Sequence, residues 1–299
     1  MEKIGVVTVL FNSAKVIMPF IECVISQQHT KFNIYIIDNN SQDNSLEIIS
    51  NFTDSRIRLI RNDSNIGVAA ANNIGIKNAF KDNCSKVLLL NNDIEFSSNL
   101  FSGLIQAQDL YGCSLVAPKI MFHSNKDIIW YAGGWFKKIN GFLPFHRGLK
   151  EKDIGQFNTP VQVDYASTCC LLVNKEVIED IGFMDEKYFV YFDDTDFLFR
   201  VFLNDKHKLW YSPNLVLFHK VGSLSNSFKG KKVRGDFFLQ QNIKNHVYFL
   251  RKIQSLYAYF FIIFLFFKNN LRYIFSSSMK KNFATFLLVN KSYFQGFKL

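Results

Sequence analysis

Short apolar runs alternate with amphipathic stretches through the first third of the chain, and this alternation constrains the fold more than any other feature. The apolar runs are bounded by polar residues and have the length of buried strands. The stretches between them have the spacing of helices that cover a hydrophobic surface. Strands and helices that alternate in this way form a mainly parallel sheet with helices on both faces. We predict strands at residues 4–10, 33–38, 57–61 and 86–90, and helices at residues 14–28, 43–52 and 67–81.

Polar residues follow each predicted strand at the point where the strand ends. In open α/β sheets, ligands bind in the crevice beyond the carboxyl ends of the strands. The sequence therefore predicts a ligand site at that edge of the sheet. The residues concerned are Asn12, Asp38-Asn39-Asn40, Asn62 with Asp63, and Asn91-Asn92-Asp93.

The last of these clusters is a candidate metal site. The strand at residues 86–90 is strongly apolar and stops abruptly at two amides and the carboxylate of Asp93. Mg²⁺ or Mn²⁺ takes only one or two protein oxygens when phosphates supply the other ligands. Asn-Asn-Asp by itself favours a simple turn, since these residues are common in turns. The tripeptide gains weight as a metal site only from the other motifs of the chain.

A second acidic cluster lies about a hundred residues later. Asp193, Asp194 and Asp196 place three carboxylates within four residues, and these repel one another unless something stabilises them. Acidic residues are favourable in the first turn of a helix, and we predict a helix from here to about residue 204. Asp196 and Arg200 are four residues apart and could pair on that helix.

The five cysteines (Cys23, Cys84, Cys113, Cys169 and Cys170) show no C-x-x-C spacing, so they indicate buried thiols in a reducing compartment. Residues 1–3 lead directly into the first predicted strand without a signal peptide. We therefore expect a cytoplasmic protein.

The charge is unevenly distributed. Residues 229–299 contain 13 Lys and Arg residues and one acidic residue, which leaves 22 basic against 24 acidic residues in the rest of the chain. We therefore predict a boundary between residues 228 and 229. Residues 1–228 would form one catalytic domain, whose two halves meet near residues 113 and 114. Residues 229–299 would form a helical tail rich in basic and aromatic residues.

The tail contains an unbroken apolar run at residues 257–267, too short to cross a bilayer unaided. A helix lying in the membrane interface, with its basic side toward anionic headgroups, fits this composition. Packing on the catalytic domain or on a second subunit of a homodimer is the alternative. Nucleic acid is disfavoured as a partner, because the Phe residues alternate with Ile and Leu rather than with charge.

Several motifs, taken together and in order, resemble the family-2 glycosyltransferases, particularly the rhamnosyltransferase-like enzymes of bacterial cell-surface polysaccharide synthesis. Residues 8–12 are similar to the opening strand, and residues 38–45 match D-N-x-S-x-D-x-S. Asn91-Asn92-Asp93 fills the D-x-D position with Asn in first place, and residues 189–200 match F-x-x-x-E-D-x-D-x-x-x-R with Asp for Glu. The resemblance covers residues 4–225. The residues matched to N-x-G-x-x-x-A-x-N-x-G are Asn65, Gly67, Ala71, Asn72 and Gly75.

The resemblance implies a GT-A-type fold: a mixed, mainly parallel central sheet flanked by helices, here with a C-terminal helical basic extension. It also implies a divalent metal cofactor, Mg²⁺ or Mn²⁺, bound by Asp93. His219 begins an H-x-x-G pattern and is implied as a second metal or diphosphate ligand. The residues implied to bind the nucleotide-sugar donor are Thr8, Phe11, Asn12, Asp38, Asn39, Asn65, Gly67, Asn72, Asn91 and Asn92.

In the same pattern Asp194 takes the position of the general base. A carboxylate base deprotonates an acceptor hydroxyl as it attacks, which contributes ~10²–10⁴-fold to the rate. A single displacement inverts the anomeric centre. The residues implied on the acceptor side are Cys169, Asp193, Asp196 and Arg200.

The expected function is an inverting transfer of sugar from a nucleotide-diphosphate donor, dTDP-rhamnose by resemblance, to a glycan or lipid-linked oligosaccharide acceptor at the inner face of the plasma membrane. A sugar-1-phosphate nucleotidyltransferase is the rival enzyme, but the first strand is followed by Phe11-Asn12-Ser13, without the glycine-rich loop that binds triphosphate. A membrane-attached nucleotide-sugar-binding protein without catalysis is the other alternative.

Overall fold

The computed structural model describes residues 2–222, 231–275 and 283–299. By its internal contacts the chain divides into two compact units. The larger, N-terminal unit contains residues 1–136, 144–189 and 193–224. The smaller, C-terminal unit contains residues 137–143, 190–192 and 225–299, so it includes two short segments from the first part of the chain.

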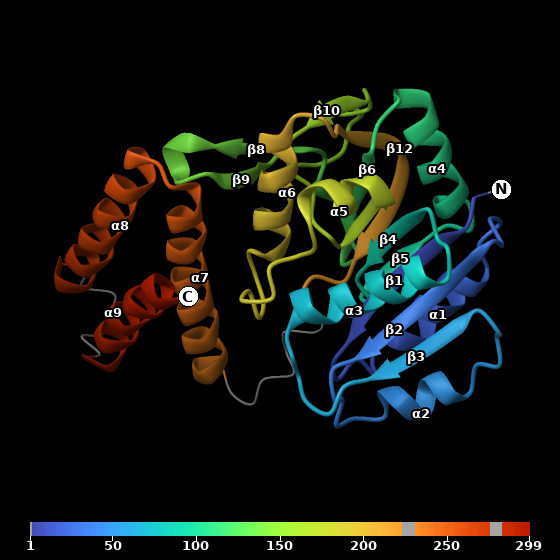
Figure 1. Cartoon of the computed structure of the whole chain (residues 1–299), viewed down its shortest axis with the longest axis horizontal. Coiled ribbons are helices and arrows are strands. Elements are labelled where there is room, and N and C mark those ends of the chain that lie inside the picture. The colour runs from blue at the N-terminus through green and yellow to red at the C-terminus, as the bar shows by residue number, and fades with distance from the viewer. Residues whose placement is uncertain (1, 223–230, 276–282) are drawn as a thin grey trace. The chain divides into compact units, whose positions relative to one another are not determined.

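A mixed sheet forms the centre of the N-terminal unit (Figure 1). Its strand order is β10-β12-β6-β11-β4-β1-β2-β3, with β5 paired to β12 and β7 paired to β6. The pairs among β4, β1, β2 and β3 are parallel, as the alternating pattern predicted. The strands are β1 (Ile4–Leu10), β2 (Phe32–Asp38), β3 (Ile57–Arg61), β4 (Lys86–Leu90), β5 (Ile94–Phe96), β6 (Leu115–Phe122), β7 (Asn125–Tyr131), β10 (Val161–Val163), β11 (Cys170–Asn174) and β12 (Leu209–His219). A separate two-stranded sheet pairs β8 (Gly134–Lys137) with β9 (Leu143–His146).

Six helices belong to the described part of the N-terminal unit. Helix α1 begins three residues later than predicted, because residues 14–16 form a turn in which the Ser13 carbonyl accepts from the N–H groups of Val16 and Ile17. The helices are α1 (Ile17–Ile25), α2 (Ser45–Ser50), α3 (Val68–Lys81), α4 (Leu100–Tyr111), α5 (Lys175–Ile181) and α6 (Asp193–Asn204).

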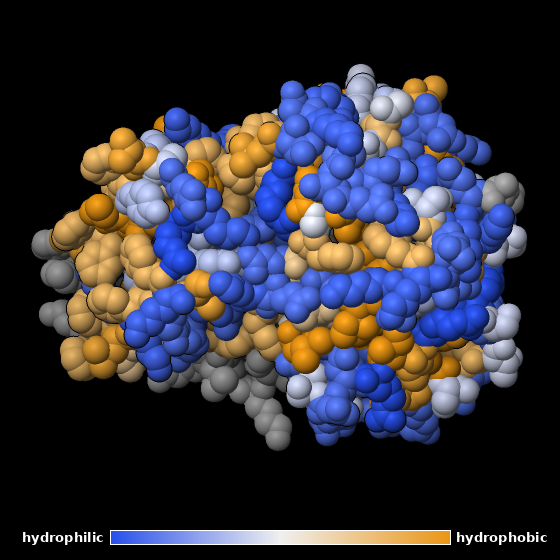
Figure 2. Space-filling view, in the orientation of Figure 1, coloured by the Kyte–Doolittle hydropathy of each residue, from blue (hydrophilic) through white to orange (hydrophobic). Residues whose placement is uncertain are grey.

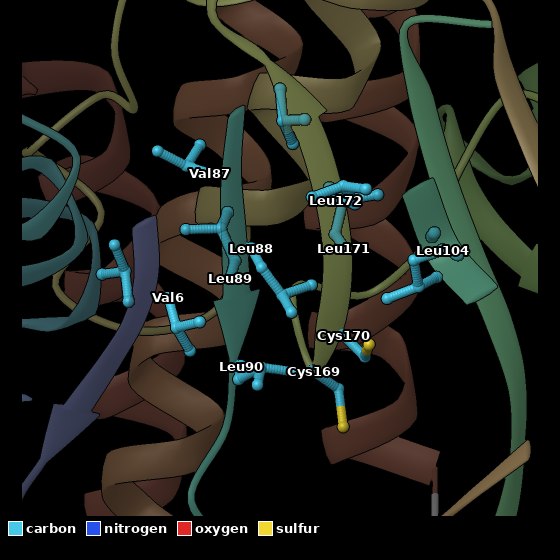
Figure 3. Close-up of a cluster of buried hydrophobic side chains, with 14 of the residues drawn as sticks. Val6, Val87, Leu88, Leu89, Leu90, Leu104, Cys169, Cys170, Leu171 and Leu172 are labelled. Atoms are coloured by element: carbon cyan, nitrogen blue, oxygen red, sulfur yellow. The ribbon is translucent and has the colours of Figure 1, made fainter. Parts of the chain in front are cut away.

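The core of this unit lies where β11 enters the sheet antiparallel between β4 and β6. All five residues of β4 are buried, and Figure 3 shows the apolar side chains of β4 and β11 next to one another. Leu90, the last residue of β4, pairs with Cys170, the first residue of β11. The two strands therefore bring the Asn91 and Cys169 backbones together, and Asn91 N–H donates to the Cys169 carbonyl over 3.0 Å.

Helix α3 lies directly against β1 because two glycines remove the side chains between them. A Cβ on Gly75 would come within 2.3 Å of Val7 Cγ1, and a Cβ on Gly5 within 2.3 Å of Ala79 Cβ. The predicted GT-A-type arrangement is confirmed in outline: a mixed, mainly parallel sheet flanked by helices, followed by C-terminal helices.

The C-terminal unit is built from α7 (Lys231–Ile253), α8 (Leu256–Phe275) and α9 (Phe283–Lys298), together with the short 3-10 helix η1 (Lys138–Asn140). Its core is small, and Asn269 donates to the Tyr293 hydroxyl over 2.8 Å beside it. Within the described residues, no helix has the length and apolar character needed to cross a membrane. The buried core residues are Val247, Leu250, Ala258, Ile262 and Tyr293.

Candidate functional site

The carboxyl ends of β1 and β2 meet in the sheet, since Leu10 pairs with Asp38. Asn39 then ties three loops together. Its backbone N–H donates to the Leu10 carbonyl over 2.8 Å, its amide donates to the Gly67 carbonyl over 3.1 Å, and its side-chain oxygen accepts from Asn62 over 2.8 Å. The Asn39 side chain therefore holds together the loops at which the nucleotide is predicted to bind.

The neighbouring side chains of Asn12 and Asp38 also accept hydrogen bonds from the protein itself. Asn12 has a left-handed backbone (φ 51°), and its side-chain oxygen accepts from the Gln42 N–H over 2.7 Å. The buried Asp38 carboxylate accepts from the Ser41 N–H over 3.1 Å. Thr8 differs: among the described residues its hydroxyl is buried without a hydrogen-bond partner. A buried polar group without a partner is costly, so the Thr8 hydroxyl retains the capacity for one further hydrogen bond.

Gly67 occupies a turn that no other residue would fit. Its φ is +88°, and a Cβ there would lie 2.6 Å from the Phe189 carbonyl oxygen. Val68 N–H donates to that same oxygen over 2.7 Å, and the Asn65 side chain accepts from Gly67 N–H over 3.0 Å. The turn before α3 is thus fastened to the segment that leads toward α6.

One assignment within α3 needs correction. Counted from Gly67, the asparagine of the N-x-G-x-x-x-A-x-N-x-G pattern falls on Asn73, not on Asn72. Both side chains are buried. The Asn73 amide donates to the Met184 carbonyl over 2.9 Å, and the Asn73 side-chain oxygen accepts from the Met184 N–H over 3.1 Å. Asn73 therefore braces the same segment that Gly67 contacts.

Asp93 and His219 form the candidate metal pair. Asp93 Oδ1 lies 3.3 Å from His219 Nε2, and both side chains are buried. The contact arises because β12 ends beside β5, where His219 pairs with Ile94. Asn92 anchors the loop from the other side by donating to the Val9 carbonyl over 2.8 Å, and its own side-chain oxygen is buried without a partner among the described residues.

Cys169 lies beside the same histidine. Burial alone would lower the pKa of the His219 imidazole, whereas the neighbouring Asp93 carboxylate raises it. Burial raises the pKa of the Cys169 thiol. The structure thus places Cys169, which the sequence assigned to the acceptor side, next to the metal pair.

The donor set fits a divalent cation that is shared with a diphosphate. The described residues contain no cluster of three or more His, Cys, Asp or Glu side chains that could hold a metal. A carboxylate oxygen and an imidazole nitrogen would supply two ligands, and Mg²⁺ typically takes its remaining ligands from phosphates and water. Asp93 and His219 would be the two ligands from the protein.

Asp194 lies in the first turn of α6, where the sequence predicted a helix start. Its carboxylate accepts a hydrogen bond from the Tyr165 hydroxyl over 2.8 Å and another from the Thr195 hydroxyl over 3.2 Å. Burial raises the pKa of Asp194, and these two hydrogen bonds oppose that rise. Burial and the charge of Asp194 raise the pKa of Asp193. Two side-chain hydrogen bonds therefore favour the ionised form of Asp194.

Asp196 and Arg200 pair with each other as predicted, over 3.0 Å. The Arg200 guanidinium also donates to the carbonyl groups of Ile181 and Phe183. Tyr188 donates to the other oxygen of Asp196 over 3.3 Å. This network holds α6 to the segment before it.

A row of aromatic rings connects the metal pair to the acidic pair. Trp130 packs against both His219 and His146, with ring centroids 4.9 and 5.1 Å apart. His146 stacks on Tyr165 at 5.5 Å, and Tyr165 donates to Asp194. Sequence analysis missed Trp130, His146 and Tyr165, because they are single aromatic residues in an irregular region and belong to none of the motifs.

The mixed sheet with its polar strand ends defines the GT-A class of nucleotide-sugar-binding folds. The family model of glycosyl transferase family 2 matches residues 5–182, more than half of the chain, and the chain belongs to that family. The predicted resemblance is thereby confirmed.

Curated relatives are similar to this chain at low identity. The low-salt glycan biosynthesis hexosyltransferase Agl10 of Haloferax volcanii is 27% identical over 55% of this chain, and the match spans about half of that protein (52%). The dTDP-rhamnosyl transferase RfbF of Shigella flexneri is 26% identical over 67% of this chain and 68% of its own length. The Escherichia coli UDP-Glc:alpha-D-GlcNAc-diphosphoundecaprenol beta-1,3-glucosyltransferase WfaP is 23% identical over 82% of this chain and 89% of its own length.

Solved structures share the fold. A crystal structure of GalNAc-T7 with UDP, GalNAc and Mn²⁺ superposes with a TM-score of 0.62 at 15% identity, over 84% of this chain and 48% of that one. The crystal structure of Staphylococcus aureus TarS residues 1–349 gives a TM-score of 0.57 at 13% identity, over 99% of this chain and 81% of that one.

Proposed function

We propose that this chain is an inverting glycosyltransferase that moves a sugar from a nucleotide-diphosphate donor to a hydroxyl of a glycan or lipid-linked oligosaccharide. The observation that carries this proposal is the half-buried Asp194 carboxylate, held by Tyr165 and joined by aromatic rings to the Asp93–His219 pair. The site therefore has a base at one end and a place for a cation and a diphosphate at the other.

The proposed chemistry is one displacement. Asp194 accepts the proton of the acceptor hydroxyl as the hydroxyl oxygen forms a bond to the anomeric carbon. The bond from that carbon to the diphosphate oxygen breaks, and its electron pair leaves with the nucleoside diphosphate. Because attack and departure occur on opposite faces, the anomeric configuration inverts.

A bound Mg²⁺ or Mn²⁺ would supply positive charge to the departing diphosphate. Asp93 and His219 are the residues that would hold it. GalNAc-T7, which shares the fold, was crystallised with Mn²⁺, and this supports a divalent metal.

The donor and acceptor proposals follow the relatives. RfbF is named a dTDP-rhamnosyl transferase, which favours dTDP-rhamnose as donor. WfaP acts on a diphosphoundecaprenol-linked sugar, which favours a lipid-linked acceptor at the inner face of the plasma membrane. Nucleotide release from dTDP- and UDP-sugars, with and without lipid-linked oligosaccharide, tests both.

The base is tested by Asp194→Asn. We expect the substitution to lower acceptor-dependent transfer by ~10²–10⁴-fold while binding of the nucleoside diphosphate persists. Asp205→Asn is the matched control, since the Asp205 side chain is 86% exposed and pairs only with Lys208 among the described residues. Equal transfer by wild type and Asp194→Asn would exclude Asp194 as the base. A protein that binds nucleotide-sugars but transfers none would favour the non-catalytic alternative.

We further propose that α8 places the protein on an anionic membrane surface. One side of α8 carries large apolar residues at helical spacing, each at least 42% exposed. Figure 2 shows hydrophobic residues gathered over this helix. The chain has no Asp or Glu after Asp236, so its charge suits anionic headgroups. The exposed residues of α8 are Leu256, Tyr259, Phe260, Ile263, Phe264, Phe267 and Leu271.

Flotation with vesicles of phosphatidylglycerol and phosphatidylcholine tests the membrane proposal. Each exposed Phe that enters the lipid contributes about 1.5–3 kcal/mol. We therefore expect Phe260→Ser/Phe264→Ser to abolish flotation, and Leu110→Ser/Leu203→Ser, which removes two exposed leucines of the N-terminal unit, to leave it unchanged. Wild type that stays with the soluble fraction at every phosphatidylglycerol content would refute lipid binding and favour a second copy of the chain as the partner of α8.

A further inference from the structure

Two residues just before the acidic pair have an unusual backbone. Tyr191 has φ 64° and Phe192 has φ 71°, in the left-handed region that residues with a side chain disfavour. Two consecutive non-glycine residues in this conformation persist only where their surroundings hold them.

Asn245 of α7 supplies that hold. Its amide nitrogen donates to the Val190 carbonyl and to the Tyr191 carbonyl, over 2.9 Å each. Asn245 is completely buried, and both of its N–H donors are used. One side chain therefore fixes the two peptide groups at which the backbone turns left-handed.

Ring contacts from the same helix complete the clamp. Phe192 is buried against His246 and Phe249, with centroids 5.4 and 5.9 Å apart, and Tyr191 packs edge-on against Phe238 at 5.3 Å. By contacts, residues 190–192 belong to the C-terminal unit. These three residues are therefore held by the tail, although they lie far from it in sequence.

The clamped segment continues directly into the base. Phe192 is followed by Asp193, the first residue of α6, and then by Asp194. No residue lies between the clamp and the helix start to absorb a change in backbone direction. We propose that Asn245 is a positioning residue: it fixes the backbone immediately before α6 and so sets the aim of the Asp194 carboxylate. This inference rests on the proposed role of Asp194 as base.

The variant that tests it is Asn245→Leu, which keeps the size of the side chain and removes both donors. Asn242→Leu is the matched control on the same helix, because the Asn242 amide donates to the Phe238 carbonyl of α7 itself. Hydrogen–deuterium exchange of residues 191–196 reports the clamp without any assay of activity. Release of nucleoside diphosphate from dTDP- and UDP-sugars, measured against pH, reports the base.

We expect Asn245→Leu to speed exchange at residues 191–196 at least tenfold and to lower kcat at least tenfold, with the donor KM within twofold of wild type. The acidic limb of the kcat profile should move to higher pH, because Asp194 loses the Tyr165 hydroxyl that favours its ionised form. The other groups that face Asp194 are His146, Asp193 and the Thr195 hydroxyl. Asn242→Leu should match wild type in every measurement.

If Asn245→Leu lowers the thermal midpoint by more than a few degrees, Asn245→Ser replaces it, since Ser keeps a shorter donor and should give an intermediate loss of kcat. Unchanged exchange, or faster exchange with unchanged kcat and pH profile, would overturn the positioning role. An inactive wild type with the predicted exchange difference would instead refute the proposed function while leaving the clamp in place.

Discussion

The phenol of Tyr165 donates a 2.8 Å hydrogen bond to Oδ2 of Asp194. Tyr165 is itself fixed, because Tyr131 donates to its carbonyl over 2.8 Å and His146 stacks on its ring. The Asp194 carboxylate is thus oriented by a Tyr165 side chain whose own position is fixed. A hydrogen bond to the charged form also favours ionisation, which opposes the effect of burial on the pKa of Asp194.

Tyr165→Phe removes this hydrogen bond and little else. We expect kcat to fall roughly 10–100-fold, because a hydrogen bond to a charged group contributes about 1.5–3 kcal/mol. The acidic limb of the pH–rate profile should shift upward, since the pKa of Asp194 rises further. Steady-state rates from pH 4 to 9 provide the measurement. Tyr211→Phe is the control, because that hydroxyl donates to the Phe157 carbonyl instead.

Removal of metal should stop transfer. We expect a chelator to abolish nucleotide release and Mn²⁺ or Mg²⁺ to restore it. His219→Ala should raise the metal concentration needed by roughly tenfold or more, since loss of a group that only orients a metal ligand already costs about that much. His123→Ala is the control, because His123 pairs with Glu95 rather than with Asp93. Full activity of wild type in excess chelator would contradict the metal assignment.

Gly67→Ala should destabilise the fold more than the same change at a glycine in an open turn. Gly112 also has a positive φ (+57°), but a Cβ there meets nothing within 4 Å. Gly112→Ala should therefore cost only about 1–2 kcal/mol for the left-handed backbone. Gly67→Ala combines a backbone that only glycine adopts readily (φ 88°, ψ 171°) with the overlap with Phe189, so it should cost clearly more, with loss of donor binding. Urea unfolding measures both variants, and equal costs would show that the segment at Phe189 moves aside freely.

Asp193 should make stability depend on pH. Its pKa rises from an ordinary carboxyl value to about 8 in the folded protein, so the unfolded chain loses this proton at lower pH. Folding stability therefore falls as pH rises between about 4 and 8, by on the order of 1 kcal/mol per pH unit at most. Asp193→Asn should lose this slope and be more stable than wild type at pH 8. Thermal midpoints from pH 5 to 8, with Asp205→Asn as control, test the sign.

The sequence predicted the parallel half of the sheet well, because β1, β2, β3 and β4 each have a local apolar pattern that ends in polar residues. The antiparallel insertion of β11 between β4 and β6 was not predictable, since it is set by pairing between distant segments. The same limit applies to the site. Asp93 and Asp194 belong to motifs, whereas Tyr165 lies 29 positions from Asp194 and is recognisable only from the contact itself.

The contacts also give structural roles to side chains for which the sequence indicated another role or none. Besides the ligand contacts that the motifs predict for them, the side chains of Asn39 and Arg200 hold neighbouring loops in place. Conversely, Asn245 had no motif to mark it. Its importance follows from the left-handed backbone at Tyr191 and Phe192, which no sequence pattern indicated.

The most direct test of the central claim is the configuration of the sugar that the enzyme releases. Proton NMR can observe the anomeric signal of sugar hydrolysed from the preferred donor by the wild-type chain, before the free sugar equilibrates. A single displacement in which Asp194 activates the attacking oxygen predicts that the first-formed sugar has the anomeric configuration opposite to that in the donor. Release with the donor's own configuration would contradict the account.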